Sequence, residues 1–327
     1  ADLGLRVFIG PRQAMVSSSD VTESALDELV DRAVAMAGSV PEDPFCGLAE
    51  QDQLATDFPD LDGCDESEPS TDKLSERAAE AEDAARAVPG VTNSEGAEAS
   101  WSRSNIAIAA TNGFQQGRSG SRHSISASVL AGEGTEMERD YDYVTTVHGN
   151  DLPLPGDIGR TAGEKAVSRL NPKKAESAAV PVVYDPRVAN SLVRHLSSAV
   201  NGTAVARGTT FLKDKVGEKI FPEAVTIVDD PLRPRGLGSK SFDGEGVGTK
   251  RLDIIDGGVL TSWIMDLRSA RQLGLSTTGH AARGTSSPPS PSTTNLYLEA
   301  GDVTPEALMA DIKSGLYVTE LMGFGIN

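Results

Sequence analysis

The side chains best suited to metal or acid–base chemistry in this 327-residue chain are four histidines and two cysteines. No histidine has a second histidine within five residues or an adjacent glutamate, so a pair of imidazoles cannot be built on one helix. Cys46 and Cys64 are 18 positions apart, with no further ligand nearby, which excludes a zinc site of the usual local spacing. These residues predict neither a catalytic group nor a metal ligand.

Two histidines are nevertheless candidates for a functional role. His195 lies beside the apolar stripe of a helix predicted over 187–201, where it is either a base or ligand or, as the pattern favours, a partly buried structural residue. His280 lies in TTGHAARG, a loop of small residues from which an imidazole could contact a ligand. The stripe consists of Val188, Leu192, Leu196, Ala199 and Val200.

The segment RPRGLGSKSFDGEGVGTKR, residues 233–251, is the most distinctive in the chain. Its glycines allow the backbone to approach a ligand closely, and its two acidic residues add carboxylates. It is either a tight loop between strands or a strand edge that pairs with an extended peptide. On the second interpretation, the substrate-binding candidates are Asp243, Gly244, Glu245, Gly246 and His280.

The strands that would position these residues are predicted from alternating apolar residues and turn residues. Turns are expected at Gly10-Pro11, Asn112-Gly113 and Asp256-Gly257. The predicted strand segments are 4–18, 99–114, 121–134, 137–146, 180–184, 224–230, 249–256 and 259–267.

Five helices are predicted from apolar periodicity and capping residues. The first starts with a capping-box arrangement of Asp20 and Glu23. Asp185-Pro186 is expected to open the fourth helix and Asn201-Gly202 to end it. The apolar face of the first helix comprises Leu26, Leu29, Val30, Ala33 and Val34. The other helices are predicted over 72–88, 157–170, 187–201 and 305–313.

Charge and composition exclude several classes of protein. The 48 acidic and 30 basic residues give a net charge of −18, and residues 41–100 contain 17 acidic but only 3 basic residues. That stretch is expected to be a solvated surface, and nucleic-acid binding is disfavoured because no basic cluster exists. No run of about 18 apolar residues exists, so no membrane segment is expected, and the low cysteine content favours the cytoplasm.

Length and pattern predict an α/β (α+β) protein of two domains. Residues 1–172 are expected to place two or three helices on a sheet, and residues 178–327 to form a strand-rich domain. Because the chain starts within a sheet and stops without a closing helix, it is expected to lack its first strand or helix and its natural C-terminus.

Several long strings are specific enough to indicate a family. They are HLSSAVNGTAVARGTTFLKDKVGEKIF, VTIVDDPLRPRGLGSKSFDGEGV, WIMDLRSARQLGLSTTGHAARG and PPSPSTTNLYLEAGD. Together they resemble the PmbA/TldE branch of the TldD/PmbA family through residues 178–323. A weaker resemblance is present in DLGLRVFIGPRQAMVSSSD and GEGTEMERDYDY.

This resemblance implies an intracellular protease of two related subunits, TldD and TldE, that cleaves unfolded or flexible peptides. The family's older label, modulator of DNA gyrase, does not require DNA contact, and the acidity of this chain argues against such contact. In the TldD branch a helix carries His-Glu-x-x-x-His. Its imidazoles and a distant cysteine hold zinc while the glutamate acts as general base.

Aligning GTTFLKDKVGEKI with the stretch after that motif places the motif on residues 193–198. Val193 and Ser198 then occupy the histidine positions, and Arg194 occupies the glutamate position. An aliphatic side chain cannot ligate zinc, and a guanidinium cannot act as a base at neutral pH. The resemblance therefore implies a TldE-type chain without catalytic residues.

The sequence thus predicts the non-catalytic subunit of a two-component zinc protease. This chain is expected to carry no cofactor, with zinc in a TldD-like partner and an unfolded peptide as substrate. The alternative is a stand-alone peptide-binding protein, or a homodimer, with no protease role.

Overall fold

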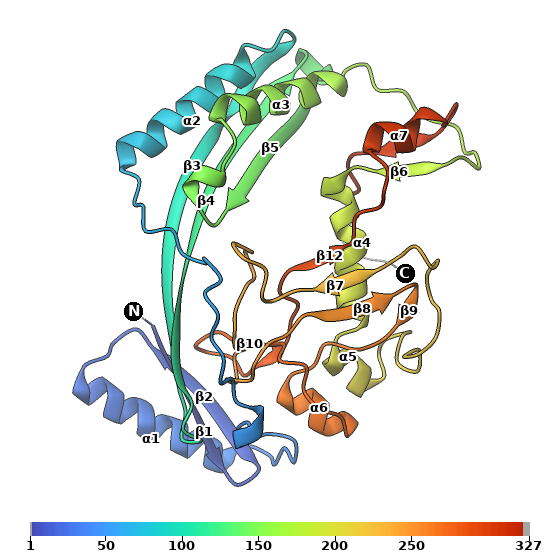
Figure 1. Cartoon of the computed structure of the whole chain (residues 1–327). Helices are drawn as coiled ribbons and strands as arrows, with labels where there is room; N and C mark the ends of the chain where they lie inside the picture. The colour runs from blue at the N-terminus through green and yellow to red at the C-terminus, as the bar shows by residue number, and fades with distance from the viewer. Residues whose placement is uncertain (1, 323–327) are drawn as a thin grey trace.

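The computed structural model describes residues 2–322 and has the mixed α/β architecture that the sequence predicts (Figure 1). Strands β3 (Val91–Ala109) and β4 (Gln115–Ala131) form a long curved ribbon. One helix-and-hairpin unit lies at one end of this ribbon, two helices cover the other end, and the second half of the chain lies beside it. No helix within residues 2–322 is long and apolar enough to cross a membrane.

The N-terminal unit is a β-hairpin covered by one helix. Strands β1 (Leu3–Ile9) and β2 (Arg12–Ser18) pair antiparallel around the predicted turn, where Gly10 has a φ of +56°. Helix α1 (Glu23–Ser39) packs its small apolar stripe against them. The stripe is Leu29, Ala33 and Ala37.

Two details of the α1 prediction are wrong. Thr22, not Asp20, is the N-cap, and no capping box forms, because the Asp20 carboxylate accepts the Thr22 amide in a local turn at 2.9 Å. Val30 and Val34 are exposed, at 47% and 45%, since the buried stripe follows the four-residue spacing from Leu29.

Residues 40–70 are irregular apart from a 3-10 turn at Gln51–Gln53. The acidic side chains of residues 42–60 are exposed, as expected for a solvated surface, except that of Asp43. Arg271 donates to the carbonyls of Phe45 and Leu48 at 3.3 and 2.6 Å, and Arg268 pairs with Asp43 at 2.6 Å. Arginines of the second half thus hold this segment against the C-terminal body.

The central unit is a three-stranded antiparallel sheet, in the order β3-β4-β5, covered by helices α2 and α3. Its remaining elements are β5 (Glu138–Thr146), α2 (Thr71–Arg86) and α3 (Pro155–Ser168). The core joins alternate residues of β4, such as Ile125 and Val129, to alanines of both helices. The pairing of β4 with β5 ends at His123, so the rest of β3 and β4 continues as a two-stranded ribbon to the Asn112-Gly113 turn.

The C-terminal body is built around the sheet β12-β7-β8-β9. Helix α4 ends at Ala199 rather than at the predicted Gly202, because Asn201 caps a new helix by accepting the Thr203 amide. Leu192, expected in the apolar stripe of α4, is 46% exposed, whereas the other four stripe residues are buried. The helices are α4 (Pro186–Ala199), α5 (Gly202–Arg207), α6 (Leu267–Leu273) and α7 (Pro305–Ala310), the last ending before the predicted Lys313. The strands are β6 (Val182–Tyr184), β7 (Ile227–Asp229), β8 (Leu252–Asp256), β9 (Val259–Leu260), β10 (Ala281–Ala282), β11 (Ser290–Pro291), β12 (Leu296–Leu298) and β13 (Leu316–Val318).

The predicted boundary between residues 172 and 178 falls in an irregular stretch between α3 and β6. Arg187 of α4 crosses from the C-terminal body to the buried Asp140 of β5, at 2.7 and 3.2 Å. Burial acts to raise the pKa of Asp140. The Arg187 hydrogen bond and the other bonds and charges at the carboxylate together outweigh burial, so the pKa is lowered. The division into two domains stays a prediction. The prediction of a truncated C-terminus falls on residues 323–327, which lie outside the described part of the chain.

The contact between α2 and α3 gives a test of the packing. A Cβ on Gly159 would lie 1.9 Å from the carbonyl oxygen of Ala81, whereas one on Gly156 would lie no closer than 3.7 Å to any neighbour. We expect Gly159→Ala to lower the free energy of unfolding by about 2 kcal/mol or more, because neither backbone can yield freely. The matched variant Gly156→Ala should be neutral or slightly stabilising. Urea titration of both variants is the measurement, and wild-type stability of Gly159→Ala would contradict the close helix approach.

Candidate functional site

The glycine-rich segment folds around the buried carboxylate of Asp243. Its Oδ1 accepts hydrogen bonds from the amides of Glu245 and Val247, at 2.8 and 3.0 Å, and its Oδ2 accepts that of Ala281 at 3.0 Å. Burial raises the pKa of Asp243, although these bonds and nearby Lys240 oppose the rise. The Asp243 side chain is therefore engaged in holding two distant segments together.

The neighbouring Glu245 joins the N-terminal hairpin to helix α6. Its carboxylate pairs with the Arg6 guanidinium at 3.3 Å and accepts the Leu267 amide at 2.9 Å. The side chain is 3% exposed, and burial raises its pKa to about 7. In this geometry the Glu245 carboxylate is bonded to groups of the protein itself, not directed at a ligand.

The two candidate glycines of this turn differ in their surroundings. Gly246 has a φ of +81°, and a Cβ there would lie 2.8 Å from the Phe114 ring. Its carbonyl accepts the Ala55 amide at 2.9 Å, so this glycine is covered. Gly244 instead lines a cavity. Of the two glycines, only Gly244 borders open space, and its amide donates to the Ala281 carbonyl oxygen at 2.8 Å.

His280 is completely buried at the edge of the C-terminal sheet. Its Nε2 lies 3.1 Å from Oδ2 of Asp229, and its Nδ1 lies 2.8 Å from the Thr278 carbonyl oxygen. These contacts are structural in this chain. Contact of a ligand with His280, Asp243, Gly244, Glu245 or Gly246 stays a prediction.

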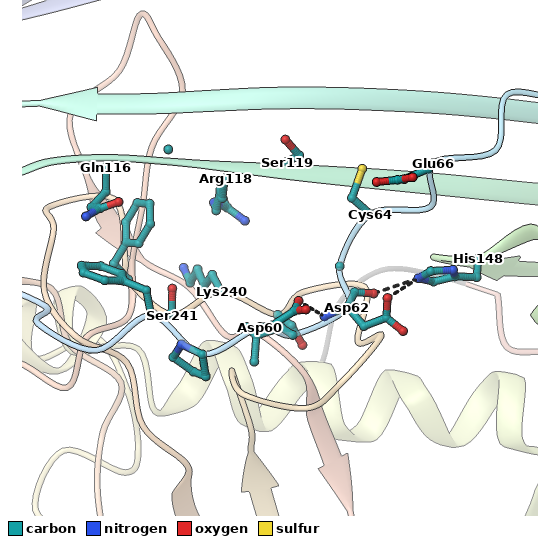
Figure 2. A pocket seen from close by; sticks show the side chains of 17 residues that line it. Asp60, Asp62, Cys64, Glu66, Gln116, Arg118, Ser119, His148, Lys240 and Ser241 are labelled. Carbon is teal, nitrogen blue, oxygen red and sulfur yellow. Dashed lines mark hydrogen bonds and ion pairs between the residues drawn. The ribbon is translucent and has the colours of Figure 1, made fainter.

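Two adjacent cavities lie between the β3–β4 ribbon and the C-terminal body, and we call them together the ribbon cleft. The first, of about 500 Å³, lies between the irregular segment 58–66, the ribbon at 116–119 and residues 239–242 (Figure 2). Its rim carries Asp62, which pairs with His148 at 3.1 Å and Arg235 at 2.6 Å. Asp60 and Glu66 also line this cavity, so its wall carries acidic as well as basic side chains.

The second cavity, of about 360 Å³, lies on the other side of Arg118 and Lys240, which line both cavities. Its walls are the start of β1, the β3 segment 105–108, Gly244 and residues 281–285. Three cationic side chains line it, Arg118, Lys240 and Arg283.

Lys240 is the most enclosed of these cations, at 9% exposure. Its ammonium donates to the Ala281 carbonyl oxygen at 3.2 Å. Burial lowers the pKa of Lys240, and the positive charge of Arg118 lowers it further. The negative charge of nearby Asp243 raises it, but by less than burial lowers it. Figure 2 shows Arg118 and Lys240 reaching from opposite walls into the same space.

The sequence pattern did not indicate these three cations as site residues. Arg118, Lys240 and Arg283 lie on three segments far apart in the chain, and none forms a local motif. The one feature of the sequence that could have indicated this site is the glycine-rich segment, because it contains Lys240. Only the approach of the ribbon to the C-terminal body brings the three together.

The positions aligned with the zinc motif lie on α4 and do not fit a metal. Val193 packs against the core of the C-terminal body, Arg194 is exposed, and the Ser198 hydroxyl donates to the Arg194 carbonyl at 3.3 Å. His195 is half-buried between them. Within residues 2–322, no group of three or more histidine, cysteine or acidic side chains is arranged to hold a metal ion.

Sequence comparison finds similarity along almost the entire chain. Models of the PmbA/TldA metallopeptidase match in three parts: domain 1 at residues 1–37, the central domain at 64–170 and the C-terminal domain at 177–327. Metalloprotease PmbA of Escherichia coli O157:H7 is 37% identical over 326 residues, which cover 99% of this chain and 70% of that protein. A Metalloprotease PmbA homolog of Haemophilus influenzae is 34% identical with the same coverage.

Solved structures share the fold. A protein of Bacteroides thetaiotaomicron described as a modulator of DNA gyrase superposes with a TM-score of 0.89 at 26% identity, over 98% of this chain and 71% of that one. TldE from Thermococcus kodakarensis superposes with a TM-score of 0.85 at 23% identity, over 98% of this chain and 72% of that one. The second likeness concerns the fold alone.

Titration of Glu245 gives a test of the site. Because its pKa in the folded chain lies above the ordinary 4.5, the folded state holds this proton more tightly than the unfolded state. Glu245 therefore stabilises the fold most below about pH 4.5, and this contribution falls as the pH rises through about 7. We expect Glu245→Gln to remove up to about 3 kcal/mol of the stability difference between acidic and alkaline pH.

The measurement is urea unfolding of wild type and variant from pH 5 to pH 8. Glu306→Gln, which removes an exposed glutamate of α7, is the matched control and should leave the pH profile unchanged. The same pH profile for Glu245→Gln and wild type would show that this carboxylate is not held protonated near neutral pH.

Proposed function

The chain belongs to the PmbA/TldD metallopeptidase family, and from this membership we propose that it is the non-catalytic, TldE-type subunit of a two-component zinc protease. The substrate of that protease is an unfolded or flexible peptide. Zinc and the general base belong to a TldD-like partner subunit, and this chain contributes binding surface.

The observation that carries this proposal is the chemistry of helix α4. A zinc-activated water needs imidazole or carboxylate ligands and a base that takes a proton. Val193 offers a hydrocarbon, Ser198 a neutral hydroxyl bonded within its own helix, and Arg194 a permanently charged donor. A metal therefore has no place on this helix, although the family is named for one, and no step of hydrolysis is assigned to these residues.

A partnership is supported by the segment that follows α5. Phe211 is 82% exposed, while the adjacent Leu212 is 4% exposed and belongs to the core of the C-terminal body. Val216 and Phe221, on the same segment, are exposed at 44% and 36%. Aromatic side chains presented from a well-anchored segment are typical of the centres of protein interfaces. We assign this surface, residues 211–221, to contact with the partner.

The alternative function is a stand-alone peptide-binding protein or a homodimer without a protease role. The observation that favours it is the ribbon cleft, in which Arg118, Lys240 and Arg283 of this chain offer binding groups to a ligand. The two functions differ in whether hydrolysis appears when the partner is added.

The first experiment separates these functions. The isolated chain should carry no stoichiometric zinc by elemental analysis and should not cleave an unstructured peptide. Mixed with a TldD-like protein, it should form a stable complex whose peptidase activity disappears with a chelator. About one zinc per isolated chain, or sustained cleavage by it, would overturn the proposal. Failure to associate at micromolar concentration would favour the stand-alone binding protein.

The second experiment tests the assigned surface. Phe211→Ala should weaken association with the TldD-like protein by tenfold or more, about 1.4 kcal/mol, because truncation of a central aromatic commonly costs that much. Its thermal stability should be unchanged, since the ring is 82% exposed. Leu154→Ala, which truncates a 68% exposed leucine before α3, is the matched control and should bind normally. Affinity is measured by calorimetry. If Phe211→Ala binds the TldD-like protein as tightly as Leu154→Ala does, residues 211–221 are not part of the interface.

A further inference from the structure

The second cavity of the ribbon cleft concentrates positive charge in a chain of net charge −18. Arg118 comes from the ribbon, Lys240 from the glycine-rich segment and Arg283 from the irregular segment directly after β10. Because carboxylates are abundant elsewhere in the chain, three cations facing one cavity are not a consequence of composition.

The negative groups near this cavity act on the cations through their charge, as Asp243 does on Lys240, but none of them forms an ion pair with Arg118, Lys240 or Arg283 in the described part of the chain. The Asp243 carboxylate is 2% exposed and accepts three backbone amides. The carboxylate of Asp2, at the cavity wall, receives a hydrogen bond from the Thr285 hydroxyl. Within residues 2–322, the ion pairs include none made by Arg118, Lys240 or Arg283. Glu245, which is near Arg283, pairs with Arg6 instead.

Lys240 in particular has unused bonding capacity. An ammonium has three donor hydrogens, and one of them is used on the Ala281 carbonyl. A nine-tenths buried ammonium with donors left over is costly unless an acceptor fills the space. Arg118 also lines the cavity beside it.

The remaining walls indicate the kind of molecule that carries the acceptor. Ile106 and Ile108 of β3 and Met15 of β2 supply apolar surface, and Gly244 adds no side chain to the wall. A volume of about 360 Å³ accommodates a few residues of an extended chain. A planar carboxylate matches the fork of an arginine, and a single negative charge is repelled less than a dianion by a strongly acidic protein.

We propose that this cavity binds a carboxylate of an extended peptide through Arg118, Lys240 and Arg283. The identification of the ligand as a peptide rests on the proposed function, whereas the anion site itself does not. Two sources supply the same group, an acidic side chain or the C-terminal carboxylate. The site thus gives this chain a preference for peptides that carry a carboxylate at one defined position.

The experiment uses the isolated chain and eight-residue Ala/Gly peptides that are acetylated at the N-terminus. One is amidated and carries a central glutamate, one is amidated and carries glutamine instead, and one carries glutamine with a free C-terminus. By calorimetry at low ionic strength, one or both carboxylate peptides should bind at least about tenfold more tightly than the neutral peptide, as expected for a charge-assisted bond. The tighter of the two identifies the source, and added salt should weaken its binding.

Variants locate the site. Arg118→Gln should remove most of the preference for the carboxylate peptide. Arg122→Gln, four residues along the same strand and outside both cavities, should retain it. Lys240→Met, which keeps the apolar stem, should act like Arg118→Gln, provided that its urea unfolding shows an intact fold. Inorganic phosphate added as a competitor should displace the peptide only at much higher concentration.

Equal affinity for the neutral and carboxylate peptides would overturn the proposal, as would a preference that survives Arg118→Gln. Tighter binding of inorganic phosphate than of either peptide would also overturn it and assign the cavity to phosphate. None of these measurements needs the partner subunit or proteolysis. Failure of the hetero-complex would therefore refute the proposed function without touching the anion site, and the reverse also holds.

Discussion

The buried carboxylate of Asp243 is the constraint on which the joining of the two halves depends. A carboxylate enclosed by protein must be surrounded by donors, and three backbone amides from two segments meet this requirement. They fix the turn 243–247, which then offers the Glu245 side chain to Arg6 and the Gly246 carbonyl to Ala55. The N-terminal hairpin, the irregular segment and the C-terminal body therefore meet at one turn, and the ribbon cleft is the space left beside it.

Around this junction, ion-paired acidic residues lie on the irregular segment, and cations that form no ion pair within residues 2–322 line the second cavity of the ribbon cleft. Acidic residues of the irregular segment pair with arginines of the second half, as Asp43 does with Arg268 and Asp62 with Arg235. These pairs are partly exposed, so each adds little stability by itself, and their main effect is to place the segment. Asp62 lines the first cavity of the cleft together with Arg118 and Lys240, whereas the second cavity, which adds Arg283, contains neither Asp62 nor Asp43. An overall acidic chain thus retains a locally positive cavity, which composition alone cannot indicate.

The sequence predicted the elements of the fold better than the way they meet. Alternation along β4, the turn at Asn112-Gly113 and the Asp185 N-cap of α4 are local signals, and the structure confirms them. The pattern also identified residues 233–251 as distinctive. It could not show that Gly246 is covered by Phe114, because those residues are more than a hundred positions apart. The family resemblance was confirmed because it rested on long strings, whereas the anion cavity has no contiguous signal to read.

Helix α4 shows why a chain can retain a scaffold without its chemistry. The side of α4 that contains Val193, Leu196 and Val200 packs against the sheet, so this helix is needed for the C-terminal core whatever occupies its outer face. A subunit without reacting groups can accelerate hydrolysis only by holding the peptide where the partner's groups act. Cations that fix one carboxylate set the distance from that point to the bond that is cut. In the proposed assembly, the ribbon cleft of this chain would therefore determine the position of cleavage along the peptide, while the zinc site of the partner determines the rate at that position.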